Sequence, residues 1–277
     1  MNGTMKRLSD RILGGAMVAM LGLVLAFLVT PLLVTCLLAF DSRSFLGPLP
    51  PPALSLRWFE KLASLDYVAT GLATSLKIAV LATAIDVLVG TTAAVALDRG
   101  DFRGRGLLMA AFLSPLIVPA VVIGLALLLF LSRIGVVDGF TRLLCGHVVI
   151  TLPYVVRTVL ASLAGRDRRL TEAALVLGAT EREAFWTITL PLIRSGMVTG
   201  AVFAFAVSLD DVAVSMFLTD PSTYTLPVAL VSSMRASFDL SIAAAAVLLM
   251  AVTAVLIIVL ERFVGFDRLL GQGLFRS

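Results

Sequence analysis

Long apolar runs constrain this chain more than any other feature, because each is about 20 residues long or longer and carries few charges. A helix rises about 1.5 Å per residue, so each run is long enough to cross the roughly 30 Å hydrocarbon core of a bilayer. The composition agrees: 59% of the residues are hydrophobic and 14% are charged, against about 25% charged in soluble domains. The sequence therefore predicts an all-α integral membrane protein with six transmembrane helices.

The whole chain, residues 1–277, is predicted to be one transmembrane domain. The six predicted spans cover approximately residues 12–40, 69–97, 107–131, 143–163, 196–218 and 242–261. The first run is longer than the apolar part of a signal peptide and has no small-residue cleavage site after it, so we interpret it as an uncleaved span. In the loop that follows, the residues around Trp58 are expected to form a short helix at the membrane interface. Pro115 and Pro119 are expected to kink the third span.

The Lys and Arg residues predict the orientation of the spans. Fourteen of them lie at the two termini, in the loop after the second span and in residues 165–195, whereas six lie in the alternate loops. Because cytoplasmic loops carry the excess of Lys and Arg, both termini and residues 165–195 are predicted to be cytoplasmic. This distribution also accounts for the net charge of +4 without a nucleic-acid partner.

The loop of residues 165–195 has the local signals of two short helices. Thr171 is expected to cap a helix that begins at Glu172 and stops at Gly178 in a left-handed conformation. Thr180 and Glu183 have the spacing of a capping box, which predicts a second helix directly afterwards, and Pro191 suits the first turn of the next helix. An apolar stripe on the first helix needs a partner surface; it is formed by Leu170, Ala174 and Leu177.

The same loop carries a recognisable motif. Its defining positions are Glu172, Ala173, Ala174, Gly178, Ile188, Leu190 and Pro191. These residue types at this spacing resemble the EAA loop of permease subunits in binding-protein-dependent ABC importers. An ordinary helical hairpin of a soluble domain is disfavoured, because apolar spans flank the loop. The resemblance implies that residues 165–195, with Leu177 in the apolar stripe, contact a cytoplasmic ATPase.

Ionisable residues inside spans are costly, so they indicate where a substrate could pass. Lys77 and Arg157 are expected to snorkel toward the membrane surfaces. Asp86 lies nearer the middle of its span, and a buried helix partner and a place in the substrate pathway are equally compatible with its position. The chain's one histidine, His147, has no second ligand at metal-binding spacing, which favours a packing or interfacial role.

Asp210 and Asp211 are adjacent in an otherwise apolar run. Because successive side chains on a helix point about 100° apart, one carboxylate is free to face a cavity while the other braces a neighbour. A mobile organic cation would offset their repulsion, but a purely structural role where the span breaks toward the outer loop is the alternative. Tyr154 and Tyr224 are candidates for aromatic contacts with an ammonium group.

Nearly the whole chain resembles the spermidine/putrescine permeases, in the segments LPYVVRTVLASL, SPLIVPAVVIGLALL and SLDDVAVSMF. The resemblance implies uptake of a small cationic solute, with Asp210, Asp211, Asp86 and Tyr154 as candidate pathway residues. It also implies two ATPase subunits, a second and different permease, a periplasmic binding protein and a bacterial inner membrane location. Related permeases for ferric iron, opines or phosphonates share the loop, so these substrates remain alternatives.

The sequence lacks motifs for catalysis. It contains no Walker A, HExxH or GxSxG pattern, so ATP and Mg²⁺ are expected to bind a separate ATPase, and neither a cofactor nor a metal site is expected in this chain. Two other classes of protein fit this sequence less well. An intramembrane aspartyl enzyme would need facing carboxylates on different helices, and an ion-gradient-driven carrier often has an inverted repeat, which is not evident here.

Overall fold

The structure is a computed structural model, and it describes residues 3–100, 102–236 and 239–264. Helices account for most of these residues, and extended pairing within the described ranges is limited to one isolated antiparallel bridge between Asp41 and Leu54. Contacts divide the chain into two compact units, residues 1–65 with 234–251, and residues 66–233 with 252–277. The single transmembrane domain stays a prediction. The basic tail lies, from residue 265 onward, outside the described residues.

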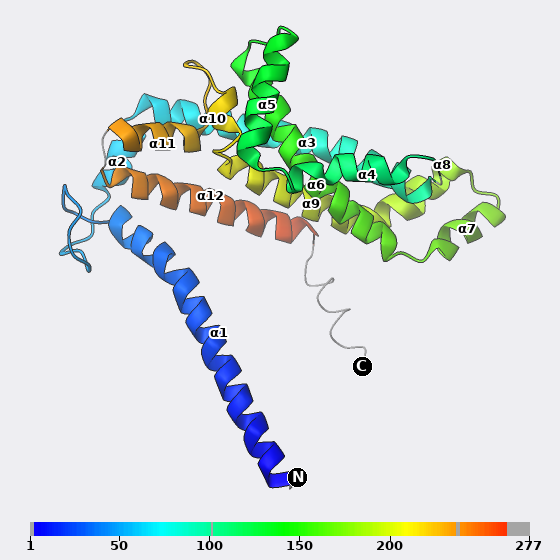
Figure 1. Cartoon of the computed structure of the whole chain (residues 1–277), viewed down its shortest axis with the longest axis horizontal. Coiled ribbons are helices and arrows are strands. Elements are labelled where there is room, and N and C mark those ends of the chain that lie inside the picture. The colour runs from blue at the N-terminus through cyan, green and yellow to red at the C-terminus, as the bar shows by residue number, and fades with distance from the viewer. Residues whose placement is uncertain (1–2, 101, 237–238, 265–277) are drawn as a thin grey trace. The chain divides into compact units, whose positions relative to one another are not determined.

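The first unit contains α1 (Gly3–Ala39), α2 (Arg57–Ala63) and the part of α12 (Ser241–Val264) that ends at Ala251. The helix expected around Trp58 is α2 (Figure 1). Its tryptophan is buried within this unit, because it is 3% exposed and its indole Nε1 donates a 2.8 Å hydrogen bond to the Asp41 carbonyl. Trp58 therefore anchors the loop after α1. A place at the membrane interface stays a prediction.

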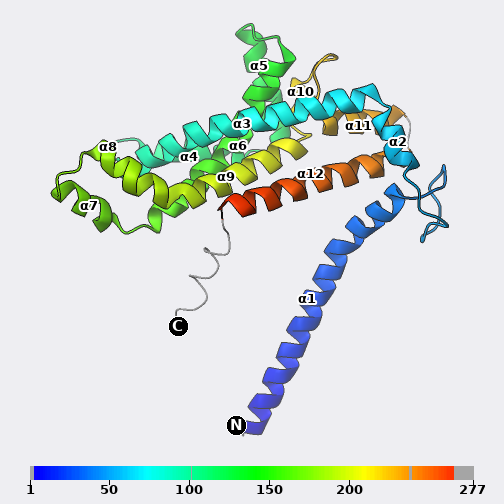
Figure 2. The same ribbon diagram turned by 180° about the vertical axis from the view of Figure 1, so that it is seen from behind.

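The second unit holds the remaining elements. They are α3 (Asp66–Arg99), α4 (Arg105–Leu113), η1 (Ser114–Leu116), α5 (Ala120–Arg133), α6 (Gly139–Ala164), α7 (Arg168–Val176), α8 (Glu181–Ala184), η2 (Phe185–Thr189), α9 (Leu190–Asp210), α10 (Ser215–Leu218), α11 (Leu226–Ala236, to Ser233 in this unit) and the end of α12. Figures 1 and 2 show α3, α6 and α9 side by side from opposite directions.

Small residues bring α6 and α9 close together. A Cβ atom at Gly200 would lie 2.8 Å from the backbone Cα of Val155, and one at Gly196 would lie 2.7 Å from the Thr158 carbonyl oxygen. Such close approach of backbones is typical of packed membrane helices. An apolar cluster fills the rest of this contact; it consists of Ala94, Val155, Val159, Leu163, Ile193 and Ala204.

The third predicted span is broken. The prolines turn the chain by 108° between α4–η1 and α5, with Pro115 in η1 and Pro119 at the N-cap of α5. The expected kink is thus confirmed, and it is a break in the helix, because Pro119 has an extended ψ of 131° and interrupts the helical hydrogen bonds. One span over 107–131 stays a prediction. Nine residues in α4 extend only about 14 Å, too short to cross a membrane alone.

The fifth predicted span is displaced along the sequence. We expected residues 196–218, but the continuous apolar helical segment is Glu181–Asp210, and a break separates it from α10. The helix ends because Asp211 is extended, with ψ of 127°, and its carboxylate instead accepts hydrogen bonds from the chain that follows. The chain therefore leaves the helix between the two adjacent aspartates.

Four described helices are long and apolar enough to cross a membrane, or five if the bent pair counts as one span. They are Leu13–Ala39, Asp66–Arg99, Gly139–Ala164 and Glu181–Asp210, and a shorter apolar helix covers Ser241–Val255. The chain is therefore an all-helical membrane protein with several spans. A count of six stays a prediction.

Candidate functional site

The two short helices of the motif loop are present, with one corrected boundary. The first, α7, begins at Arg168 rather than Glu172, because the side chain of Asp167, not Thr171, accepts the capping hydrogen bond, from the Arg169 backbone N–H at 3.0 Å. Thr171 lies one turn inside α7, where its hydroxyl has no partner among the described residues. Asp167 is as good a capping residue as Thr171 and lies where the helical signal begins.

The end of α7 and the start of α8 agree with the sequence. Gly178 has a φ of +96°, the left-handed conformation that stops the first helix. Thr180 Oγ1 accepts from the Glu183 backbone N–H, and the Glu183 carboxylate accepts from the Thr180 backbone N–H at 2.7 Å, so the capping box is confirmed. The second helix then passes through the π-helical turn η2 into α9, with Pro191 in the first turn of α9.

The apolar stripe on α7 is open to solvent at its C-terminal end. Leu177 is 87% exposed and Leu170 is 51% exposed, whereas Ala174 is half-buried. Val176, which the helical spacing did not single out, is also 87% exposed. Glu172 and Ala173 are exposed as well. Exposed large side chains next to one another at a helix end form a surface that another protein can cover.

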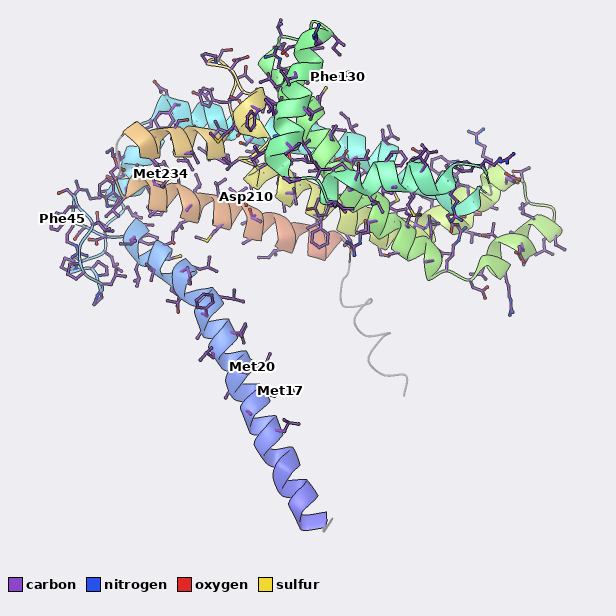
Figure 3. The ribbon with its side chains drawn as sticks, viewed as in Figure 1. Met17, Met20, Phe45, Phe130, Asp210 and Met234 are labelled. Atoms are coloured by element: carbon purple, nitrogen blue, oxygen red, sulfur yellow. The ribbon has the colours of Figure 1, made fainter. Side chains whose placement is uncertain are left out.

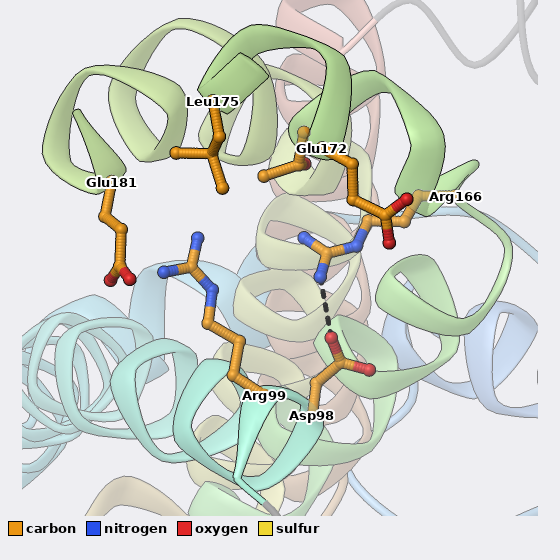
Figure 4. Close-up of a pocket in the computed structure, with 7 residues that line it drawn as sticks. Asp98, Arg99, Arg166, Glu172, Leu175 and Glu181 are labelled. Atoms are coloured by element: carbon orange, nitrogen blue, oxygen red, sulfur yellow. Dashed lines mark hydrogen bonds and ion pairs between the residues drawn. The ribbon is translucent and has the colours of Figure 1, made fainter. Parts of the chain in front are cut away.

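A charged cavity of about 440 Å³ lies beneath this loop (Figure 4). Its lining consists of Asp98, Arg99, Arg166, Thr171, Glu172, Leu175 and Glu181. Arg166 donates a 2.7 Å hydrogen bond to Asp98, and both side chains are nearly buried. This ion pair joins the end of α3 to the turn between α6 and α7.

Two guanidinium groups meet at the base of the loop. Nitrogen atoms of Arg99 and Arg166 each lie 3.4 Å from the hydroxyl of Thr189, the last residue of η2. Arg99 also lies over the Phe185 ring, 5.7 Å from its centre, which is within reach of a cation–π contact. The cytoplasmic end predicted for α3 is therefore tied to the start of α9 through side chains.

The two adjacent aspartates have different surroundings. Asp210 is the last residue of α9 and is exposed (Figure 3). Asp211 is half-buried, and its Oδ2 accepts from both the backbone N–H and the hydroxyl of Ser215, each at 2.8 Å. One carboxylate is thus open while its neighbour holds the first turn of α10.

Asp210 shares a helix face with an aromatic side chain. Phe203 lies seven residues earlier on α9, two turns and about 10 Å along the axis, on nearly the same face. Its half-exposed ring stacks with that of Tyr154 from α6 at 6.3 Å between centroids. Phe203 was missed in the sequence, although its spacing of seven from Asp210 was a usable signal.

Asp86 is fully buried between α3 and α6, where its carboxyl group hydrogen bonds with the Thr151 hydroxyl. Its Oδ1 has no partner among the described residues. His147 is also fully buried, and its ring bridges two serine hydroxyls from α9 and α10. The sequence predicted a packing or interfacial role for His147 and did not predict these two hydrogen bonds, because their partners are known only from the fold. Over the described ranges, no three metal-ligating side chains come together.

Comparisons with known proteins give one consistent family. Residues 86–266 match the family described as "Binding-protein-dependent transport system inner membrane component". The chain is 32% identical to the spermidine/putrescine transport system permease protein PotC of Shigella flexneri, over 94% of this chain and 96% of that protein. It is 33% identical to the putrescine transport system permease protein PotI of Escherichia coli K12, over 81% and 82% of the two chains.

Solved structures share the fold. A chain of a bacterial ABC transporter involved in the import of the acidic polysaccharide alginate has a TM-score of 0.74, at 16% identity, and the match covers 95% of this chain and 98% of that chain. A chain of a bacterial alginate ABC transporter in complex with an alginate pentasaccharide-bound periplasmic protein has a TM-score of 0.73, also at 16% identity. This match covers 92% of this chain and 94% of that chain.

Proposed function

This chain belongs to the family of binding-protein-dependent transport system inner membrane components, and on that premise we propose that it forms half of an import pathway for a linear polyamine. It is a permease subunit of an ABC importer in a bacterial inner membrane. The observation that carries the polyamine proposal is the exposed carboxylate of Asp210 in line with the Tyr154–Phe203 aromatic pair.

An ammonium group suits the position of Asp210 for two reasons. The carboxylate supplies a negative charge, and the C-terminal end of α9 adds the partial negative charge of its unpaired carbonyl groups. About 10 Å away along α9, the aromatic pair offers a face to an alkyl chain or to a second ammonium group. A linear di- or triamine has this pattern of charge and apolar length.

The other two carboxylates have supporting roles in this proposal. Asp211 shapes the break after α9, because it is occupied by hydrogen bonds to the α10 backbone and to Ser215. Asp86 belongs to the wall between α3 and α6, since it is fully buried and bonded to Thr151. Only Asp210 is free to exchange water for a substrate.

The motif loop is proposed to couple the pathway to ATP hydrolysis by two separate ATPase subunits. The exposed Val176 and Leu177 supply an apolar contact surface at the elbow made by Gly178. A displacement of α7 would be transmitted to α3 through the Arg166–Asp98 pair and to α9 through the contact of Arg166 with Thr189. The ATPases bind ATP and Mg²⁺, and no cofactor is assigned to this chain.

The remaining assembly follows from the relatives and from the charge distribution. PotC and PotI are permeases of polyamine transport systems, and the resemblance to that family favours a second, non-identical permease as partner in our proposal. The fold neighbour in complex with a periplasmic protein supports delivery of substrate by a periplasmic binding protein. The excess of Lys and Arg supports six spans with both termini and the motif loop in the cytoplasm.

Uptake by the reconstituted complex tests the proposal. Vesicles containing this chain, its partner permease, the ATPase and the binding protein should accumulate labelled putrescine or spermidine only with ATP. Asp210→Asn should raise KM at least tenfold, because a hydrogen bond to a charged group contributes about 1.5–3 kcal/mol. Asp86→Asn is the matched control and should change KM by less than about threefold, since the amide still bonds to Thr151.

Two results would overturn it. Absence of polyamine uptake, with uptake of an opine, a phosphonate or ferric iron instead, would assign another substrate to the same permease. A KM for polyamine that responds to Asp86→Asn and not to Asp210→Asn would move the pathway away from the end of α9.

A further inference from the structure

A chain of buried hydrogen bonds joins α6 to the break between α9 and α10. His147 on α6 contacts Ser208 Oγ through Nδ1 at 2.6 Å and Ser215 Oγ through Nε2 at 2.9 Å. Ser215 in turn bonds to Asp211 at 2.8 Å. His147 and Ser215 are fully buried and Ser208 is 2% exposed, so water does not compete for these bonds.

The direction of each bond follows from its last member. A carboxylate only accepts, so the Ser215 hydroxyl donates to Asp211. Because the one proton of the Ser215 hydroxyl is donated to Asp211, Ser215 Oγ must accept a hydrogen bond from His147 Nε2–H. Burial favours the neutral ring, in which Nδ1 then carries no proton and accepts from the Ser208 hydroxyl. One neutral tautomer of His147, protonated at Nε2, satisfies all the bonds.

The same network lies next to a close contact between α10 and α6. A Cβ atom at Gly146, the residue before His147, would lie 2.3 Å from Leu218 Cδ1 and 3.0 Å from Val214 Cγ1. The short helix α10 therefore packs directly on the turn of α6 that carries His147. The segment after the α9–α10 break is thus held by contacts with α6 as well as by its connection to α9.

We propose that His147, acting through Ser215 and Asp211, is a positioning residue that holds the α9–α10 break and so aims Asp210 at a cationic substrate. This inference rests on the proposed function, because Asp210 is there the residue that binds an ammonium group. His147 itself does not touch the substrate. Its loss should therefore alter the affinity of the site more than the rate of the transport cycle.

Polar replacements at His147 separate its two contacts. Gln has its amide nitrogen near the position of Nε2 and still donates to Ser215, whereas the shorter Asn reaches only toward Ser208. In the reconstituted complex, His147→Asn and Ser215→Ala should raise the KM for putrescine about three- to tenfold with a smaller change in kcat. His147→Gln should restore KM to within about twofold of wild type.

Two serines serve as controls. Ser208→Ala removes the bond on the far side of the ring and should raise KM less than Ser215→Ala does. Ser233→Ala on α11, whose hydroxyl donates to the Ala229 carbonyl and to no other group that the structure describes, should leave uptake unchanged. Equal effects of Ser208→Ala and Ser215→Ala, or failure of Gln to restore what Asn loses, would overturn the proposal.

A second measurement is independent of the substrate. His147 is the only histidine in the chain, so the full-length protein purified through a histidine-free tag and labelled with ¹⁵N-histidine gives signals from this ring alone. The spectrum should report the Nε2–H tautomer, and Asp211→Asn should weaken that preference. A ring protonated at Nδ1 or at both nitrogens in the wild type would overturn the proposed direction of the hydrogen bonds from His147 through Ser215 to Asp211. Absence of putrescine uptake would contradict the proposed function, and the spectrum would still test these hydrogen bonds.

Discussion

Arg166 lies 2.7 Å from Asp98, a residue 68 positions earlier in the chain, and the two side chains are 6% and 9% exposed. Both residues line the cavity beneath the motif loop. A buried charge that loses its partner is costly, whereas an exposed one is solvated by water. This contact is therefore expected to matter for stability as well as for coupling.

Arg166→Ala should destabilise the protein by about 3–5 kcal/mol, the usual cost of breaking a buried ion pair. Lys61→Ala is the matched control, because Lys61 bonds to Asp239 at 2.6 Å with its own side chain 47% exposed, and its loss should cost at most about 1 kcal/mol. Thermal unfolding of the purified chain in detergent measures both. Similar shifts for the two variants would contradict a structural role for Arg166.

Gly178→Val should uncouple ATP hydrolysis from transport. Gly178 has a φ of +96°, which a β-branched residue adopts only with strain, so the elbow after α7 would change direction. Gly165→Val is the control, because Gly165 has a φ of −82° and a Cβ there meets nothing closer than 3.7 Å. ATPase activity and uptake are measured in the same vesicles. Normal substrate-driven uptake by Gly178→Val would contradict the coupling role.

Gly200→Val should prevent α6 and α9 from packing. Its Cβ would lie 2.8 Å from the Val155 backbone, and overpacking of this kind costs about 1–3 kcal/mol or more. Gly22→Val on α1 makes the same change where a Cβ meets nothing within 4 Å. Size-exclusion profiles and melting temperatures compare the two. Equal yields of monodisperse protein would show that this contact tolerates a larger residue.

Acid should loosen the loop after α1. The guanidinium of Arg43 bonds to both carboxylate oxygens of Asp41 and holds the pKa of Asp41 below its ordinary value of 3.8. A carboxyl whose pKa is lower in the folded state stabilises that state above its ordinary pKa, and this contribution is lost as the pH falls through the lower, folded-state value. The loop should therefore stay ordered at neutral pH and open in strong acid.

Trp58 reports this opening, because its indole donates to the Asp41 carbonyl. In a Trp186→Phe background, Trp58 is the only tryptophan, and its fluorescence should shift to longer wavelength as the pH falls below the ordinary Asp pKa. Asp41→Asn should show the shifted spectrum already at neutral pH and no acid transition. A transition of the same size in Asp41→Asn would assign it to another group.

Local signals in the sequence predicted much of the loop that couples to the ATPase in our proposal. The capping box of Thr180 and Glu183 and the left-handed Gly178 lie within six consecutive residues, so no knowledge of packing was needed. The cap of α7 was misplaced because Asp167 and Thr171 are both suitable capping residues, and only the chain path chooses between them.

By itself, the sequence determined that this chain is helical and lies in a membrane, because run length and hydropathy depend on no contact between segments. Only the tertiary structure decided that Arg166 meets Asp98, that Phe203 stacks on Tyr154 and that His147 reaches Ser215. These partners lie 49 to 68 residues apart, as their numbers show, and they meet because α3, α6 and α9 pack together and α10 packs on α6. The different surroundings of the adjacent Asp210 and Asp211 were set in the same way, since the chain leaves the helix between them and turns one carboxylate inward.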